Sequence, residues 1–585
     1  MRHNVIPDMH LSIIPLLLPA LVLDPVPSEA SAAPMAVADE RVDDLIQRGR
    51  KHLDAGDMAS AKELFLQADA ETDGALESRM WVLRIWFLEG RINDAFDEVD
   101  RLAEDNEGAA LDYLYGMGSY LKAMNYIAQG VPSSTTDFNL QDAASFLGKA
   151  LEADAGSYYD AWFPMADAAY RTRQYDKATK PAGKAMEVEA DRARAFQLAG
   201  RVAFQRSNAA RALEDGAEQA ATLHEEAMGF FEEALERVPA EALILAGGDE
   251  TQAEGLRTTL KAELLLDMGL SCHYSGDLEA ARKFYADSIG WNPNGLDLGQ
   301  YWGSLGTTEE FVAMLEDATA KFTERWGEKS PSDATVLWHL GWGYYQLERW
   351  ADCEGAYERV LAKWPAYVDS HHHIAMSRYQ RADYVGATEA WHEYSKLNRE
   401  SLLQTIAANP DGQAILAYTL GKCAEKAAGN EETRPEPEHN LHAVFLAKMI
   451  RDLDETNWRN HNDLGLFSRD AGDFLRWRNR EEDREEVTKL YEQSLQSYET
   501  AMRMAPEMPH LPNDTAVILH YCLERDYERA IELYKLSYEL SSALLEKGGL
   551  DEEMMQFATL GKRDSKNNMD ALLKKIEEEK EGDDG

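Results

Sequence analysis

The sequence predicts an all-α protein, a solenoid built from stacked pairs of antiparallel helices. The first observation is a fixed spacing, because GDMASAKELFLQA (56–68) is followed 34 positions later by the similar GRINDAFDEVDRLA (90–103). A constant period of this length indicates stacked supersecondary units. The second observation is that bulky apolar residues recur at helical spacing in each unit, with small residues where two helices would pack closely. No strand pattern competes along the chain.

The N-terminal residues have the pattern of a secretory signal peptide. Leu11 to Leu23 form an uncharged run of 13 residues that contains two prolines, and Ala30-Ser31-Ala32 follows as a small-residue cleavage motif. The run is too short to cross a bilayer as a helix. We therefore expect residues 1–32 to be removed from an exported protein, periplasmic or extracellular, that has no transmembrane segment in its mature chain. The alternative is a disordered leader on a cytoplasmic protein.

The repeat can be followed through most of the remaining chain. Clear units begin near residues 42, 76, 159, 193, 262, 334, 368, 458 and 511, and weaker units fill about 110–158, 296–333 and 401–457. The predicted regions are an N-terminal array over 42–295, a degenerate repeat over 296–333, a C-terminal array over 334–540, capping helices over 541–576 and an acidic disordered tail over 577–585. A cap is expected because the last apolar face of a solenoid has no neighbour.

Four polar stretches interrupt the period and are predicted to be insertions. One of them, NAARALEDGAEQAATL (208–223), would separate the two helices of the unit that begins near residue 193. The others are GVPSSTTDFNLQ (130–141), GNEETRPEPEHNLH (429–442) and DFLRWRNREEDREEV (473–487). Together with the array they leave no interval large enough for a separate catalytic domain.

Two stretches carry a resemblance to a known family. They are MGLSCHYSGDLEAARKFYADSIGWNP (268–293) and LGWGYYQLERWADCEGAYERVLAKWP (340–365). Their glycine, tyrosine, alanine and terminal proline stand in the order and at the separations of the tetratricopeptide repeat (TPR), which the sequence therefore resembles. This resemblance implies a right-handed superhelix in which the first helix of each pair lines a concave, protein-binding groove.

The aromatic stretch VLWHLGWGYYQLERW (336–350) places two stripes on the first helix of its unit. Leu337, Leu340 and Tyr344 share one face, together with Gly341, and are predicted to pack between helices. A second stripe lies on the adjacent face, which the TPR resemblance directs into the groove. Adding or subtracting the repeat extends this second stripe to the neighbouring units, and the candidate partner-binding residues are Leu266, Leu270, His273, Trp338, Trp342, Tyr345, His372, Met376 and Tyr379.

Two interpretations of these nine residues remain open. An exposed apolar patch on a charged surface is typical of an interaction site. Aromatic stripes at helical spacing are also typical of a packed interior, and inner-face rings of a tightly wound array can bury one another. If the patch is exposed, we expect it to bind an extended peptide or an amphipathic helix.

The charge of the chain limits the class of partner. Sixty basic and 105 acidic side chains give a formal net charge of -45, which would repel nucleic acid. The partner is expected to be a protein or peptide, and a basic or amphipathic segment fits the acidic surface. The sequence thus favours a non-catalytic TPR scaffold. The alternatives are a hydrolase with its site between an insertion and the groove, and a structural protein that self-associates.

No residues form a convincing metal, cofactor or catalytic motif. Consecutive histidines in HHHIA (371–375) point about 100° apart on a helix and cannot converge on one ion. In EPEHNLH, His439 and His442 stand near Glu436 and Glu438, but the stretch has the composition of an exposed insertion. The four cysteines are far apart, and we interpret them as small buried apolar residues. The sequence analysis therefore assigns no catalytic, metal or cofactor residue.

Overall fold

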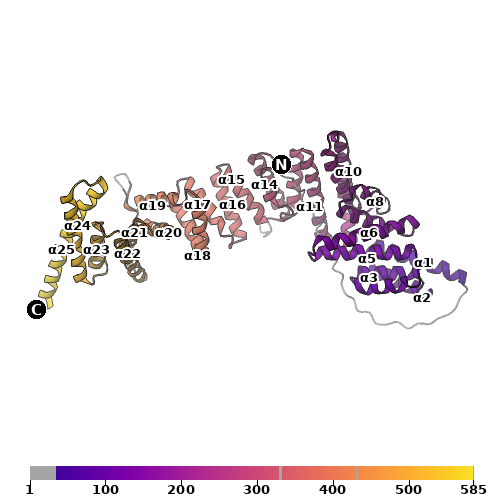
Figure 1. The fold of residues 1–585 in the computed structure, drawn as a ribbon, viewed down its shortest axis with the longest axis horizontal. Helices are drawn as coiled ribbons and strands as arrows, with labels where there is room; N and C mark the ends of the chain where they lie inside the picture. Colours follow the sequence, from indigo (N-terminus) through magenta and orange to yellow (C-terminus); the bar gives the residue numbers. More distant parts are fainter. Residues whose placement is uncertain (1–34, 328–332, 430–432, 584–585) are drawn as a thin grey trace. The chain divides into compact units, whose positions relative to one another are not determined.

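The computed structural model describes residues 35–327, 333–429 and 433–583, and in these ranges the chain is helical without any strand (Figure 1). The predicted signal peptide lies outside the described residues. The chain divides into two compact units, Met1–Val336 and Leu337–Gly585, with the division inside one helix. No described helix is both long enough and apolar enough to span a membrane.

The first unit is a succession of helices that pack against their neighbours in sequence. The helices and their bounds are α1 (Met35–Asp54), α2 (Met58–Glu71), α3 (Leu76–Leu88), α4 (Ile92–Ala103), α5 (Ala109–Ala128), α6 (Ser133–Ala153), η1 (Tyr159–Ala161), α7 (Trp162–Arg171), α8 (Tyr175–Val188), α9 (Ala193–Arg211), α10 (Ala217–Leu245), α11 (Glu250–Ser275), α12 (Leu278–Trp291), α13 (Leu298–Tyr301) and α14 (Thr308–Trp326).

The second unit continues the same arrangement from within α15. Its helices and their bounds are α15 (Ala334–Gln346), α16 (Trp350–Lys363), α17 (Asp369–Gln380), α18 (Tyr384–Ala408), α19 (Gly412–Ala428), η3 (Pro437–His439), α20 (Asn440–Leu453), α21 (Trp458–Arg478), η4 (Glu481–Asp483), α22 (Arg484–Met504), α23 (His510–Val517), the π-helical turn η5 (Ile518–Cys522), α24 (Tyr527–Lys547) and α25 (Glu552–Asp583).

Each pair is joined by a short turn, and many of these turns share one backbone conformation. Gly56, Gly90 and Gly276 have positive φ angles of 80°, 77° and 93° just before the second helix of their units. Glu348 and Ala382 take the same left-handed conformation at φ angles of 56° and 61° without the benefit of glycine. The recurrent glycine of the sequence pattern is therefore a turn residue, because a left-handed residue ends the first helix and reverses the chain.

The core of the array repeats a contact between a glycine on the first helix and a ring on the second. A Cβ atom added at any of these glycines would lie 2.5 to 2.9 Å from a buried aromatic ring. The pairs are Gly49 with Phe65, Gly200 with Phe231, Gly269 with Tyr285, Gly341 with Tyr357 and Gly465 with Tyr498. The five rings are at most 1% exposed. Close packing at glycine is what the repeat predicts, and the prediction of an all-α array of TPR-type helix pairs is confirmed.

Three of the predicted insertions are mainly helical and lengthen the helices on either side of them. The stretch 208–223 supplies the end of α9 and the beginning of α10, and Ala210, Ala220 and Leu223 form a small buried cluster there. Most of 130–141 belongs to α6, and 473–487 extends α21 and α22 around η4. Alanine-rich and charged sequence is strongly helix-forming, so an inserted stretch lengthens a pair instead of leaving it.

The C-terminal end of the chain is a long helix that packs on the last pair. Leu572 of α25 is fully buried in a cluster with residues of α22, α23 and α24, as a cap requires. The helix continues to Asp583, so the stretch predicted as a disordered tail is helical as far as it is described. Lys574 and Glu578, one turn apart at 3.5 Å, illustrate the charge pairing that supports such an extension.

Candidate peptide-binding surface

The packing stripe predicted for α15 is buried as expected. Leu337, Leu340 and Tyr344 are 0%, 3% and 9% exposed, and Gly341 lies against the ring of Tyr357 on α16. This stripe holds α15 on its partner helix. The adjacent face also touches α16, through the ring contacts of Trp338 with Tyr357 and of Tyr345 with Trp350, and it continues toward the next helix pair.

That adjacent face carries a continuous stack of rings, which we call the ring stack and define as Trp338, Trp342 and Tyr345. The ring centroids of Trp338 and Trp342 are 6.4 Å apart, and those of Trp342 and Tyr345 are 5.6 Å apart, both pairs nearly parallel. All three side chains are half-buried. The helical spacing that the sequence shows thus becomes real stacking along one face.

His373 of α17, in the next helix pair, packs against the ring stack. Its imidazole stacks on Tyr357 at a centroid distance of 4.6 Å and meets Trp338, Trp342 and Tyr345 edge-on at 5.7 to 6.2 Å. Burial among these rings lowers the pKa of His373 to about 3, so the imidazole is neutral at physiological pH. The ring stack therefore packs two successive helix pairs of the second unit together, and its three side chains stay half-buried.

The indole N–H of Trp338, at the polar edge of the ring stack, is hydrogen-bonded. Trp338 Nε1 donates a hydrogen bond to Asp369 Oδ2 at 3.1 Å, which joins α15 to the beginning of α17. Burial raises the pKa of Asp369. The neighbouring His372 accepts a hydrogen bond from Trp391 Nε1 on α18 at 3.3 Å. His372 thus belongs to the packing of its own pair.

Tyr379, the equivalent of Tyr345 in the next unit, lies in a second and more open group of rings. We call this group the tyrosine cluster and define it as Tyr379, Tyr384 and Tyr418, from α17, α18 and α19. Its centroids are 5.5 to 6.3 Å apart, with each ring meeting the others edge to face. Tyr418 is 49% exposed, and Lys422 Nζ lies 5.4 Å from its ring. Tyr418 is therefore the member of the tyrosine cluster that reaches solvent most, while Tyr379 and Tyr384 are partly buried.

The remaining candidate residues do not join either group. Met376 is 5% exposed and lies in the interior of its pair. Leu266, Leu270 and His273 belong to the first unit, where Leu270 is 5% exposed and His273 packs among Tyr274, Tyr285 and Tyr301. The sequence analysis missed Tyr384 and Tyr418, because they stand on helices for which the repeat predicts no groove position.

One serine–histidine pair and two cysteines are the groups that a hydrolase of the kind considered from sequence could use, and all of them are largely buried. Ser271 Oγ and His224 Nδ1 are 2.9 Å apart, but Ser271 is 1% exposed, so a substrate cannot reach the hydroxyl group. Burial raises the pKa of the thiols of Cys272 and Cys353 to about 11, which keeps them protonated. Neither arrangement provides an accessible, activated nucleophile.

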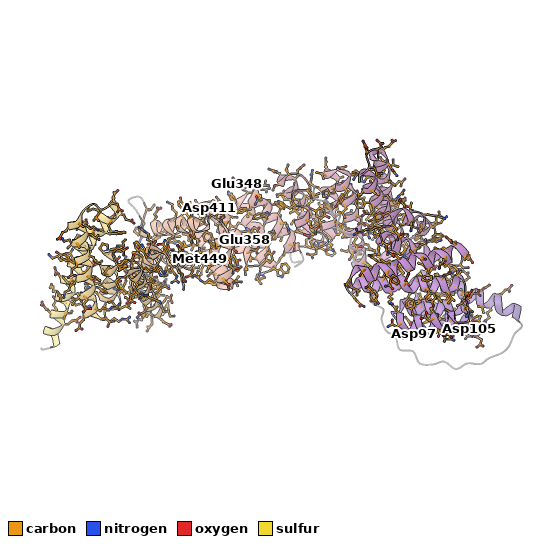
Figure 2. The ribbon with its side chains drawn as sticks, viewed as in Figure 1. Asp97, Asp105, Glu348, Glu358, Asp411 and Met449 are labelled. Carbon is orange, nitrogen blue, oxygen red and sulfur yellow. The ribbon has the colours of Figure 1, made fainter. Side chains whose placement is uncertain are left out.

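Acidic side chains lie on exposed faces of the helices in both units. Figure 2 labels Asp97 and Asp105 in the first unit and Glu348, Glu358 and Asp411 in the second, and all five are exposed. Glu358 pairs weakly with Arg378 at 3.7 Å. The excess of acid over base in the sequence is thus carried on solvated faces of both units.

Comparisons with known proteins return likenesses in structure alone. No protein-family model and no curated protein sequence matches this chain. The C-terminal part of a TPR repeat-containing protein from Cytophaga hutchinsonii is similar at 13% identity and a TM-score of 0.27, over 59% of this chain and 99% of that one. Yeast Tom70 is similar at 13% identity and a TM-score of 0.19, over 92% and 99%. At these scores the repeat assignment rests on the helix pairs and glycine contacts of the chain itself.

Proposed function

Taking as premise that the chain is an array of TPR-type helix pairs, we propose that it is a non-catalytic scaffold that binds a peptide segment of a partner protein. The observation that supports this proposal best is the tyrosine cluster, three rings from consecutive helices with one of them half exposed. Rigid aromatic anchors of this kind supply large contact area at a small cost in side-chain entropy.

The bound segment in this proposal is basic, in an extended or amphipathic helical conformation. Tyrosine faces attract arginine and lysine, each contact contributing about 0.5 to 2 kcal/mol. The net charge of -45 attracts a basic segment before contact is made. Lys422 already lies over Tyr418, so an incoming arginine would compete with it for that ring.

A peptide-display selection tests this proposal. Random 15-residue peptides are selected on the full chain, and the enriched peptides are titrated against wild type and the Tyr384→Ala/Tyr418→Ala variant. Because Tyr418 is 49% exposed and Tyr384 is only partly buried, the variant should still fold, and a melting curve would verify this. The Trp338→Ala/Trp342→Ala change is less informative. Trp338 donates a hydrogen bond to Asp369, and loss of the indole ring would disturb packing.

The expected result is enrichment of peptides with basic and aromatic residues, whose affinity falls at least tenfold in the tyrosine variant. The matched control is Trp477→Ala on α21, which removes a ring that is 77% exposed and belongs to neither group. Binding that Trp477→Ala weakens and the tyrosine variant leaves intact would contradict the proposed surface.

We also propose that the protein is exported. The support is the uncharged run from Leu11 to Leu23 and the small residues that follow it. Expression of the full chain in a bacterial host followed by N-terminal sequencing of the mature protein would test this. A mature N-terminus near Ala33 is expected, whereas an intact N-terminus in the cytoplasmic fraction would contradict export.

A further inference from the structure

We propose that His439 and His442, at the beginning of α20, form a binding site for a divalent transition metal ion of the zinc class. The two imidazoles face each other with their Nδ1 atoms 3.4 Å apart. Two nitrogen ligands of a tetrahedral zinc ion, each about 2.0 to 2.1 Å from the metal, are separated by about 3.3 Å. The observed separation is therefore that of two ligands of one ion.

A carboxylate lies near the Nε2 atom of each imidazole, within hydrogen-bond distance of His439 and farther from His442. His439 Nε2 lies 2.9 Å from Glu436 Oε2, and His442 Nε2 lies 3.9 Å from Glu389 Oε1 on α18. An ionised carboxylate only accepts hydrogen bonds, so it favours the tautomer with hydrogen on Nε2. This applies to His439, whose Nδ1 lone pair then faces Nδ1 of His442, whereas Glu389 is too far from His442 for a hydrogen bond. Carboxylates commonly orient metal-binding histidines in this way.

The proposed third ligand is the carboxylate of Glu438, in the same turn as His439. Glu436, Glu438 and His439 each offer one ligand atom, and these atoms lie within 4.8 Å of one another. Glu438 is exposed, so its side chain can move toward an ion held between the imidazoles without disturbing the core. Two nitrogens and one oxygen, with a water molecule in the fourth position, form a donor set that suits zinc.

The electrostatic surroundings are balanced in favour of a cation. The beginning of α20 carries a partial positive charge, and Lys426 Nζ lies 3.4 Å from Glu436 Oε2. The carboxylates of Glu389, Glu436 and Glu438 outnumber these positive groups. His439 is 8% exposed and held in place, so the site is organised before an ion arrives. A bound ion would fix η3 to the first turn of α20, because His439 belongs to η3 and His442 to α20.

Zinc titration of the full, chelator-treated chain tests this proposal. Calorimetry with zinc chloride should give one saturable site per chain, and cobalt(II) substituted at that site should show the visible absorption of tetrahedral coordination. His442→Ala should abolish the site, and Glu436→Gln should weaken binding about 10-fold to 100-fold, as loss of an orienting carboxylate does. His442 lies near the surface of α20, and a melting curve of the metal-free variant verifies that it is folded.

The matched control is His52→Ala in the first unit. His52 Nδ1 lies 3.0 Å from Asp57 Oδ2, so the pair reproduces one imidazole and one carboxylate without a second imidazole. Its removal should leave zinc affinity unchanged. Wild type without a saturable site, or zinc binding that is equal in wild type and His442→Ala, would overturn the proposal, the second result indicating scattered surface carboxylates.

Discussion

At the scale of single residues, the array depends on close contacts at glycine. Gly341 on α15 has the ring of Tyr357 where a Cβ atom would stand, at 2.8 Å. Tyr357 is fully buried and packed on His373, so the ring cannot move aside easily. The same contact recurs in other pairs, which makes it a property of the repeat and not of one unit.

We expect Gly341→Ala to lower the free energy of unfolding of the second unit by about 1 to 3 kcal/mol, because the added methyl group overpacks the interface. Gly355→Ala on α16 is the matched control, since nothing lies within 4 Å of its Cβ position. That change should stabilise α16 by about 0.5 to 1 kcal/mol through helix propensity. Urea unfolding followed by tryptophan fluorescence measures both, and equal effects would contradict the packing account.

His373 makes the second unit sensitive to acid. The folded protein holds the pKa of His373 at about 3, below the ordinary value of 6.5, so the unfolded chain binds the proton more tightly. Stability is therefore fully present above pH 6.5 and is lost as the pH falls below it, by about 2 kcal/mol at pH 5 from this residue. His373→Phe keeps a ring in the ring stack and should reduce the stability difference between pH 7 and pH 5 by that amount. An unchanged difference would show that His373 is not buried.

At the scale of elements, the C-terminal helix α25 acts as the cap of the array. Its apolar face covers α23 and α24, and Leu572 is fully buried while its neighbour Leu573 is 42% exposed. Because a solenoid end without a cap exposes an apolar face, the packing of this helix should contribute to the stability of the last pair.

Leu572→Ala should therefore lower the free energy of unfolding by about 2 to 5 kcal/mol, the usual cost of a cavity in a packed core. Leu573→Ala removes the same atoms one position later and should change it by less than about 1 kcal/mol. Chemical denaturation of the two variants provides the comparison. Similar costs for both would mean that α25 is not docked as described.

Helix pairs were predictable from sequence because their signals are local. The units expected near residues 76, 193 and 334 begin with α3 at Leu76, α9 at Ala193 and α15 at Ala334. The conformation of the insertions was not predictable from sequence, because stretches such as 208–223 are polar like loops and yet strongly helix-forming, and the observed contacts show that they lengthen the pairs.

The candidate site was predictable only in part. The period placed Trp338, Trp342 and Tyr345 on one face. It could not show that His373 packs between this helix pair and the next and leaves the three rings half-buried. Tyr418 stands in an irregular unit with no equivalent position. The pair His439 and His442 had a usable signal, since residues three apart share a helix face, but the turn η3 that directs both rings together was not visible in sequence.

At the scale of the whole molecule, a repeat array transmits perturbations only to near neighbours. We expect Gly341→Ala to accelerate amide hydrogen exchange in α15 to α18 and to leave α1 to α4, in the other compact unit, unchanged. Exchange followed by mass spectrometry resolves these segments. Acceleration along the entire chain would indicate one cooperative unit and contradict a description by nearest-neighbour contacts.

We propose that the second unit binds a basic peptide through the tyrosine cluster. Hydrogen exchange of the full chain with and without a peptide selected by display tests it most directly, because the affected helices are located without prior choice. We expect slower exchange in α17, α18 and α19 when the peptide is bound. This protection should be abolished by Tyr384→Ala/Tyr418→Ala and retained in Trp477→Ala. Protection confined to the first unit or to α25 would contradict it.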